Sequence, residues 1–248
     1  MIFKREELVK FFTECKEYGP VVSFREPHID KGIVLRHDID LDIKPAYEMA
    51  LLEQDCGVVS SILFLTTCHT YNISSSANRN RIRHLADIGF DIGLHFDPTV
   101  YDSGLSLEQL EQKAVREASQ IEDVTGMKVK TVSLHAPSVN NQFPLFADYT
   151  NTYDPKYFQP DNYLSDSRMN FRGKNPFEFI KKAKKELLQV LLHPIYYTES
   201  GDSYSQIMKD LVFRFADDVD EMCGAVNELH KPNLNGSSLR ITLDQVSG

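Results

Sequence analysis

Four apolar segments of this sequence each end in side chains that can bind a metal or transfer a proton. Asp38 and Asp40 follow one segment, His95 lies at the end of another, and His135 and His193 follow two more. If the segments are parallel strands, their carboxyl ends meet on one face, where such folds carry their active sites. Carboxylates and imidazoles gathered there match the ligands and acid–base groups of a hydrolytic zinc-type site.

Each of these residues also has a simpler explanation. Aspartate favours turns, so Asp38 and Asp40 could be turn formers, and a single histidine after a strand is often only hydrogen-bonded. Yet Asp38 and Asp40 lie two residues apart, and in an extended strand both side chains point to the same side. This spacing predicts that one carboxylate binds a metal while the other handles a proton.

The elements that must position these groups follow an alternating pattern along the chain. Apolar runs rich in β-branched residues indicate strands, and apolar residues at helical spacing indicate helices. The pattern predicts strands at 33–35, 58–67, 90–97, 128–138, 163–167 and 187–194, and helices at 5–18, 45–55, 81–88, 106–125, 176–186 and 204–230. Alternation of this kind favours an α/β fold with a parallel sheet or barrel. With no long linker or internal repeat, we expect one domain over residues 1–248.

Composition limits the partners and the location. The 248 residues include 36 acidic and 27 basic side chains, a net charge of −9, which disfavours binding to nucleic acid. No apolar run approaches the roughly 18 residues of a membrane span. The four cysteines are scattered, as expected of reduced thiols, and the charged start does not look like a signal peptide. We therefore expect a cytoplasmic protein, with its oligomeric state left open.

Five short motifs occur in a familiar order. They are IVLRHDID, GFDIGLHFD, VSLHAPS, YLSDS and LLHP, and they extend from about Gly32 to Tyr197. In this order they resemble the motifs of the polysaccharide deacetylase (NodB-homology, carbohydrate esterase) family, in a divergent form. The resemblance implies a distorted (β/α) barrel of about seven strands, one fewer than the eight-stranded barrel. It also implies a hydrolase that uses a divalent metal, usually zinc, to remove N- or O-acyl groups from sugars, here in surface-polysaccharide biosynthesis.

The resemblance assigns roles to individual residues. Asp38 matches the family's general base, His193 matches its C-terminal general acid, and Asp166 matches the acidic residue of the fourth motif. Asp166 would orient a neighbouring group, as carboxylates behind an active site do.

The metal ligands depart from the family pattern. The family's metal-binding aspartate falls at Ile39, its second histidine falls at Thr99, and His135 and Ala136 replace the usual Arg-Pro of the third motif. We infer that Asp40, His95 and His135 replace the missing ligands. Three N/O ligands with an open position suit a catalytic divalent metal, with zinc the first choice.

The substrate would be held by side chains around this centre. We assign Arg36, Tyr153 and Tyr157 to sugar binding, because aromatic side chains of the proline-rich segment Pro137–Asn162 could stack on a ring. Packing of these aromatics onto the barrel is an equally good explanation. Two other functions also stay open: a different barrel metallohydrolase, such as a phosphoesterase, and an inactive barrel that only binds carbohydrate.

Overall fold

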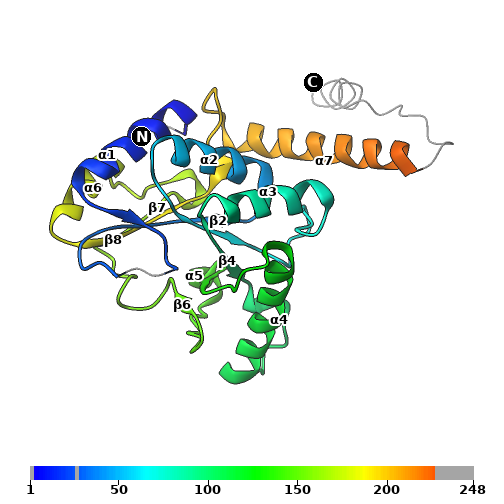
Figure 1. The fold of residues 1–248 in the computed structure, drawn as a ribbon, viewed down its shortest axis with the longest axis horizontal. Helices are drawn as coiled ribbons and strands as arrows, with labels where there is room; N and C mark the ends of the chain where they lie inside the picture. The colour runs from blue at the N-terminus through cyan, green and yellow to red at the C-terminus, as the bar shows by residue number, and fades with distance from the viewer. Residues whose placement is uncertain (1–2, 26–27, 227–248) are drawn as a thin grey trace. The chain divides into compact units, whose positions relative to one another are not determined.

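The computed structural model describes residues 3–25 and 28–226 (Figure 1). The chain divides into two compact units, Met1–Gly201 and Asp202–Gly248. The described part of the second unit is one long helix, α7 (Tyr204–Val226). The last residues of the helix that the sequence predicts at 204–230 lie outside the described residues, and the single-domain expectation stays a prediction. Everything that follows concerns the first unit.

The first unit is built on a curled sheet of parallel strands. Seven strands lie in the order β6-β5-β4-β3-β2-β8-β7, and β1 also pairs with the start of β2. The strands are β1 (Val21–Val22), β2 (Gly32–Ile39), β3 (Ser61–Phe64), β4 (Asp91–Phe96), β5 (Thr131–Leu134), β6 (Thr150–Asn151), β7 (Tyr163–Ser165) and β8 (Leu187–Leu192). The distorted α/β barrel expected from the sequence is confirmed.

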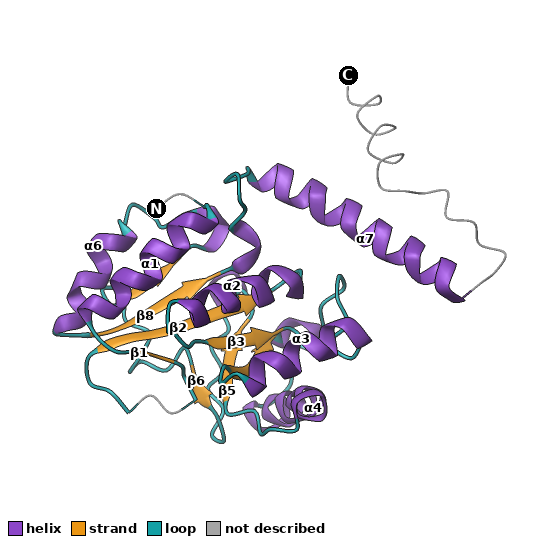
Figure 2. Ribbon diagram, turned by 45° about the horizontal axis from the view of Figure 1, so that its top comes forward, coloured by secondary structure: helices purple, strands orange, loops and turns teal. Residues whose placement is uncertain are grey.

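Helices cover the outside of this sheet. They are α1 (Arg5–Tyr18), α2 (Ile43–Asp55), α3 (Ser76–Asp87), α4 (Leu107–Thr125) and α6 (Pro176–Ile180). The short α5 (Pro137–Asn140) instead follows the carboxyl end of β5, and short 3₁₀ turns lie at Pro98–Val100, Ser167–Met169, Lys181–Lys184 and Pro194–Tyr196. Neighbouring helices pack in the order α6, α1, α2, α3, α4 (Figure 2). Their apolar faces and the strands together form the core, since helix and strand residues are buried in one cluster.

Local signals explain where the best-defined helix begins and ends. Ser106 and Gln109 form the reciprocal hydrogen bonds of a capping box at the start of α4, as the sequence predicts. Gly126 ends the helix in the left-handed conformation, with φ 72°, which glycine adopts without a steric penalty. Among the described helices, none is long and apolar enough to cross a membrane.

Strand β2 extends beyond the predicted apolar run 33–35. It continues through Arg36, His37 and Asp38 to Ile39, and all of these side chains are buried. The polar residues therefore lie within the strand and not past its end. They are tolerated there because each meets a charged or hydrogen-bonding partner: Asp38 and Tyr153 for Arg36, Glu53 for His37, and Ser133 for Asp38.

On the helix-facing side of β2, a buried hydrogen bond between His37 and Glu53 ties the strand to α2. His37 Nε2 lies 2.6 Å from Glu53 Oε1, and Ser60 donates to the other Glu53 oxygen at 2.6 Å. His37 Nδ1 lies 3.3 Å from the carbonyl oxygen of Leu192 in β8. Because both ring nitrogens face acceptors, the pair joins α2, β2 and β8 beneath the strand ends.

This pair leads to a prediction about stability. Glu53→Ala leaves the buried His37 ring and the Ser60 hydroxyl without their acceptor, and we expect the free energy of unfolding to fall by about 1–3 kcal/mol for each group left unsatisfied. Urea unfolding followed by circular dichroism measures the change. Gln54→Ala, at an exposed position of the same helix, is the matched control. Equal stability of the two variants would contradict a stabilising role for the pair.

The barrel is not closed, because its two edge strands do not pair with each other. Among the described strands, these edges are β6 and β7, at opposite ends of the strand order. The gap is bridged by a side chain: Gln189 Nε2 donates to the carbonyl oxygens of Thr152 and Tyr157, at 3.0 and 3.1 Å. The segment Pro137–Asn162 runs along this gap and is mostly irregular, with only α5 and β6 inside it.

Candidate metal centre and active site

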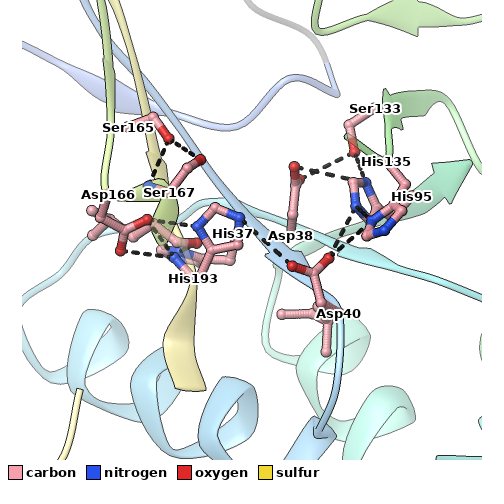
Figure 3. A network of polar contacts seen from close by, with 12 residues as sticks. His37, Asp38, Asp40, His95, Ser133, His135, Ser165, Asp166, Ser167 and His193 are labelled. Atoms are coloured by element: carbon pink, nitrogen blue, oxygen red, sulfur yellow. Dashed lines mark hydrogen bonds and ion pairs between the residues drawn. The ribbon is translucent and has the colours of Figure 1, made fainter. Parts of the chain in front are cut away.

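The carboxyl ends of β2, β4, β5 and β8 bring the predicted polar residues together at the floor of one cavity (Figure 3). The cavity has a volume of about 720 Å³. The alternation of β2 turns Asp38, and Asp40 just beyond the strand, toward the cavity, while His95 comes from β4 and His135 follows β5. His193 follows β8 on the other side of Asp40.

Three of these residues form a compact set of possible metal ligands. His95 Nε2 lies 3.1 Å from Asp40 Oδ1 and 3.1 Å from His135 Nδ1, and His135 Nδ1 lies 3.4 Å from Asp40 Oδ1. Ligand atoms about 2.0–2.1 Å from a tetrahedral zinc ion lie about 3.3 Å apart. The three atoms are thus about as far apart as the ligands of one such ion, and their role as ligands stays a prediction.

The protonation of this set also fits a metal. Asp40 Oδ1 is buried without a properly oriented hydrogen bond among the described residues, which leaves its lone pairs available. Burial by itself raises the pKa of Asp40, but His135 and His95 outweigh it and hold that pKa well below its usual range. Asp40 in turn raises the pKa of His135, against the effect of burial. A bound cation would replace the protons that these groups now share.

Ser133 fixes the tautomer of His95. Its hydroxyl donates to Asp38 Oδ1 at 3.1 Å, so it must accept at 2.6 Å from His95 Nδ1–H. A neutral His95 therefore presents an unprotonated Nε2 to Asp40 and His135, as a metal ligand must. The same hydroxyl connects the ligand set with the carboxylate of Asp38.

Asp38 is buried beside the ligands without being one of them. Its second oxygen, Oδ2, lies 3.4 Å from Arg36 Nη2 and 3.7 Å from His95 Nδ1. With Ser133 on the other oxygen, the carboxylate is held in one orientation at the cavity floor. This arrangement suits the general base assigned to Asp38, a role that stays a prediction.

His193 and Asp166 form a second pair across the floor. His193 Nδ1 lies 2.6 Å from Asp166 Oδ1, and the backbone N–H of His193 donates to the same carboxylate. His193 Nε2 is left facing Asp40, 3.8 Å from its Oδ2. Burial lowers the pKa of His193, but the charge and hydrogen bond of Asp166 reverse this and raise it to about 9. His193 is therefore protonated near neutral pH, as a general acid must be.

Arg36 does not lie where the predicted role in sugar binding requires. Its side chain is fully buried and does not line the cavity. The guanidinium lies over the ring of Tyr153, 4.7 Å from the centroid, and donates to the Tyr153 hydroxyl at 3.0 Å. Burial lowers the pKa of Arg36, but Asp38, Tyr153 and Tyr163 raise it above its usual range. The structure thus corrects the prediction: Arg36 contacts Asp38 and Tyr153 from behind the cavity floor and wall.

The two tyrosines assigned to sugar binding have different positions. Tyr153 lines the cavity, together with Phe158. Tyr157 is 8% exposed and packs against Phe24 and Val34, with its ring edge-on to Phe24 at 5.1 Å. The prediction for Tyr157 is therefore corrected to a packing role. The turns between β6 and β7 place Tyr153 at the cavity and Tyr157 against Phe24, which composition alone does not reveal.

Thr99, which replaces the family's second histidine, takes no part in the floor. Its backbone N–H and hydroxyl both bond to Asp97 Oδ1, at 2.9 and 2.6 Å, in the turn after β4. His135, the third possible ligand, comes directly after β5, the strand that pairs with β4, so its Nδ1 lies 3.1 Å from His95 Nε2. The set of possible ligands therefore has three members without a histidine at position 99, and their role in metal binding stays a prediction.

Two residues at the site were missed in the sequence. Ser133 lies two positions before His135, so the period of a strand would have placed it on the same side. Tyr163, at the start of β7, lines the cavity beside Tyr153. No sequence pattern distinguishes it from other tyrosines of this region.

Comparison with known proteins gives a distant likeness only. No protein-family model and no curated protein matches this sequence. Among solved structures, the chain is similar to the Xyl-CE4 domain of a multidomain xylanase from the hindgut metagenome of Trinervitermes trinervoides. The two share 16% identity at a TM-score of 0.45, over 77% of this chain and 85% of that one.

Two further structures show the same degree of likeness. The chitin deacetylase of Colletotrichum lindemuthianum is 15% identical at a TM-score of 0.44, over 74% of this chain and 81% of that one. A CE4 family pseudoenzyme from Bacillus anthracis is 15% identical at 0.40, over 76% of this chain and 63% of that one. Similarity at this level does not carry an activity to this chain.

Proposed function

We propose that this chain is a metal-dependent hydrolase that removes an N- or O-acyl group, acetyl in the first instance, from a sugar. The observation that carries the proposal is the ligand set Asp40, His95 and His135, flanked by a carboxylate and by a protonated histidine at the floor of one cavity. Zinc is the metal we propose, because two imidazoles and one carboxylate suit it. A role in surface-polysaccharide biosynthesis and a cytoplasmic location stay predictions.

The chain's own residues supply both proton transfers. A divalent cation held by the ligand set would supply Lewis-acid polarisation of the acyl carbonyl and acidify water. Asp38, oriented by Ser133 and Arg36, accepts a proton from the attacking water. His193, protonated by virtue of Asp166, donates a proton to the leaving nitrogen or oxygen. Asp38, Asp40 and His193 all line the same cavity, so the proposed base and acid can both reach a substrate bound at the ligand set.

Metal content gives the first test of the proposal. Protein purified without chelator is expected to carry about one divalent cation per chain, and His95→Ala is expected to lose it, because His95 Nε2 contacts both other ligand atoms. Elemental analysis by mass spectrometry measures both. The control is His28→Ala, at an exposed position away from the cavity. Unchanged metal content in His95→Ala would remove this residue from the centre.

Activity gives the second test. The metal-loaded protein is expected to release acetate from N-acetylated sugars and no phosphate from phosphomonoesters. Phosphate release without acetate would favour the phosphoesterase, and binding of sugars without release of either product would favour an inactive binding barrel.

A further inference from the structure

One wall of the cavity carries positive charge that the proposed reaction does not use. Arg168, Arg172 and Lys174 all line the cavity and all come from the short segment after β7. We call these three residues the basic wall. Among the described lining residues, the only carboxylates are Asp38 and Asp40, at the floor. The rim thus presents cations without matching anions, on a protein whose net charge is −9.

The basic wall is held in an unusual backbone conformation. Arg168, Met169 and Arg172 have φ values of 61°, 52° and 52°, a region that costs a residue with a side chain about 1–3 kcal/mol. Local hydrogen bonds fix this shape: Asn170 N donates to Asp166 O at 3.2 Å, and Arg172 N donates to Asn170 Oδ1 at 2.7 Å. Strain that is held in place at a cavity rim is typical of a binding segment.

The lysine and the two arginines of the basic wall have different roles. Lys174 Nζ donates to the carbonyl oxygens of Pro160 and Tyr163, at 2.7 and 2.8 Å, so it anchors the segment to the opposite loop. Burial is the largest cause that lowers the pKa of Lys174; the charges of Lys182 and Arg172 lower it further, and Asp161 opposes them. Arg168 and Arg172 are exposed, and no described carboxylate forms an ion pair with either. Their guanidinium groups are therefore available to a ligand.

The size of the cavity leaves room for a ligand group at this wall. A volume of about 720 Å³ lies in the upper part of the range of about 300–1,000 Å³ for small-molecule sites. An acylated sugar ring over the metal ligands would not fill it. A neutral glycan gains no charge–charge attraction from three cations at the rim. An anionic ligand does gain from them, because they offset the repulsion that the protein's overall negative charge exerts on anions.

We propose that the basic wall binds a phosphate group attached to the acylated sugar, through Arg168 and Arg172. Guanidinium groups pair with phosphate oxygens in two-point hydrogen bonds, and two of them match a group with two negative charges. The substrate class is thus a phosphorylated N-acyl sugar. This inference rests on the proposed deacylation, which places the acylated sugar over the metal ligands. It adds that the sugar carries a phosphate group, which the basic wall binds.

Three probes that share one sugar and differ in the group attached to it test the inference. They are N-acetylglucosamine, its 1-phosphate, and the same sugar linked to a nucleoside diphosphate. Binding is measured by calorimetry in the Asp38→Asn protein, which is not expected to consume them, and acetate release is measured with the metal-loaded wild type. We expect the 1-phosphate to be preferred over the neutral sugar, both in affinity and in kcat/KM. Tighter binding of the nucleotide-linked sugar than of the 1-phosphate would identify a nucleoside diphosphate as the group that carries the phosphate.

Substitution of the arginines links this preference to the basic wall. Arg168→Gln/Arg172→Gln is expected to lower the preference by about 10-fold or more for each arginine, the effect of a charged hydrogen bond. Arg116→Gln/Lys185→Gln removes the same charge at exposed positions outside the cavity and should keep the preference. In the wild type, the preference for the phosphorylated sugar over the neutral sugar should weaken as salt is added.

The outcomes separate the two proposals. Preference for the phosphate in binding, without acetate release from any probe, supports the anion site and rejects the deacylase. Acetate release with equal affinity for neutral and phosphorylated sugar rejects the anion site and supports the deacylase. A double variant that loses binding of both sugars equally would mean that the wall only maintains the structure, which also overturns the anion site.

Discussion

Asp38→Asn is expected to lower turnover by about 10²–10⁴-fold while the protein keeps its metal. An amide cannot accept the proton of the attacking water, yet it retains the shape of the carboxylate. Asp38 lies beside the ligand set and is held by Ser133 and Arg36, so its replacement leaves Asp40, His95 and His135 in place. The measurements are kcat for acetate release and metal content of the same preparation.

Two further variants define what this result means. Asp40→Asn is expected to lose metal and to regain part of its activity when excess metal is added, because its Oδ1 lies within 3.4 Å of both imidazole ligands. Asp97→Asn, in the turn after β4 and outside the cavity, is the matched control. If Asp38→Asn loses metal while Asp40→Asn keeps it, the two assignments are reversed. If neither affects metal or turnover, the enzyme hypothesis fails.

His193→Gln is expected to lower deacetylation of amide substrates by about 10²–10⁴-fold, because an amine cannot leave without a proton. Hydrolysis of p-nitrophenyl acetate should be far less affected, since its phenolate leaves unprotonated. The same comparison for Asp38→Asn should show losses on both substrates. Equal losses of His193→Gln on amide and aryl ester would contradict the role of general acid.

Asp166→Asn tests the same role through pH. The pKa of His193 is raised to about 9 chiefly because Asp166 favours the charged ring, whereas burial opposes it. Removing that negative charge lowers the pKa toward the ordinary value of about 6.5. A general acid works only when protonated, so activity should be lost at a lower pH on the alkaline side of the profile. A shift to higher pH, or no shift, would exclude this action of Asp166.

Much of the site was predictable because it depends on strand ends. The ligand set follows from three residues that each come at the carboxyl end of an apolar run, and parallel strands bring such ends together. The same reasoning supports the prediction that His135 takes the place of the family histidine that is missing at Thr99. The length of β2 was harder to predict, because the polar residues Arg36 and His37 look like the end of a strand. Only the structure shows the partners that allow them to be buried: Asp38 and Tyr153 for Arg36, and Glu53 for His37.

Features that depend on long-range packing were not predictable. Strands β1 and β6 have two residues each, too few for a periodic pattern, and they exist because a neighbouring strand offers free hydrogen-bonding groups. Tyr157 and Tyr153 belong to the same loop and have the same composition signal, yet one packs on Phe24 and the other lines the cavity. Arg168 and Arg172 look like ordinary solvated residues until the loop conformation places them at a rim.

The two-sided polarity of β2 has a consequence for folding. Asp38 faces the cavity groups, while His37 faces Glu53 behind the sheet. A slip of the strand by one residue would exchange the two faces, because successive side chains alternate. It would bring the imidazole among the metal ligands and leave Asp38 against Glu53, two buried carboxylates side by side. The contact between His37 and Glu53 behind the sheet thus penalises misaligned pairing and selects the one alignment in which the polar groups of the cavity floor meet.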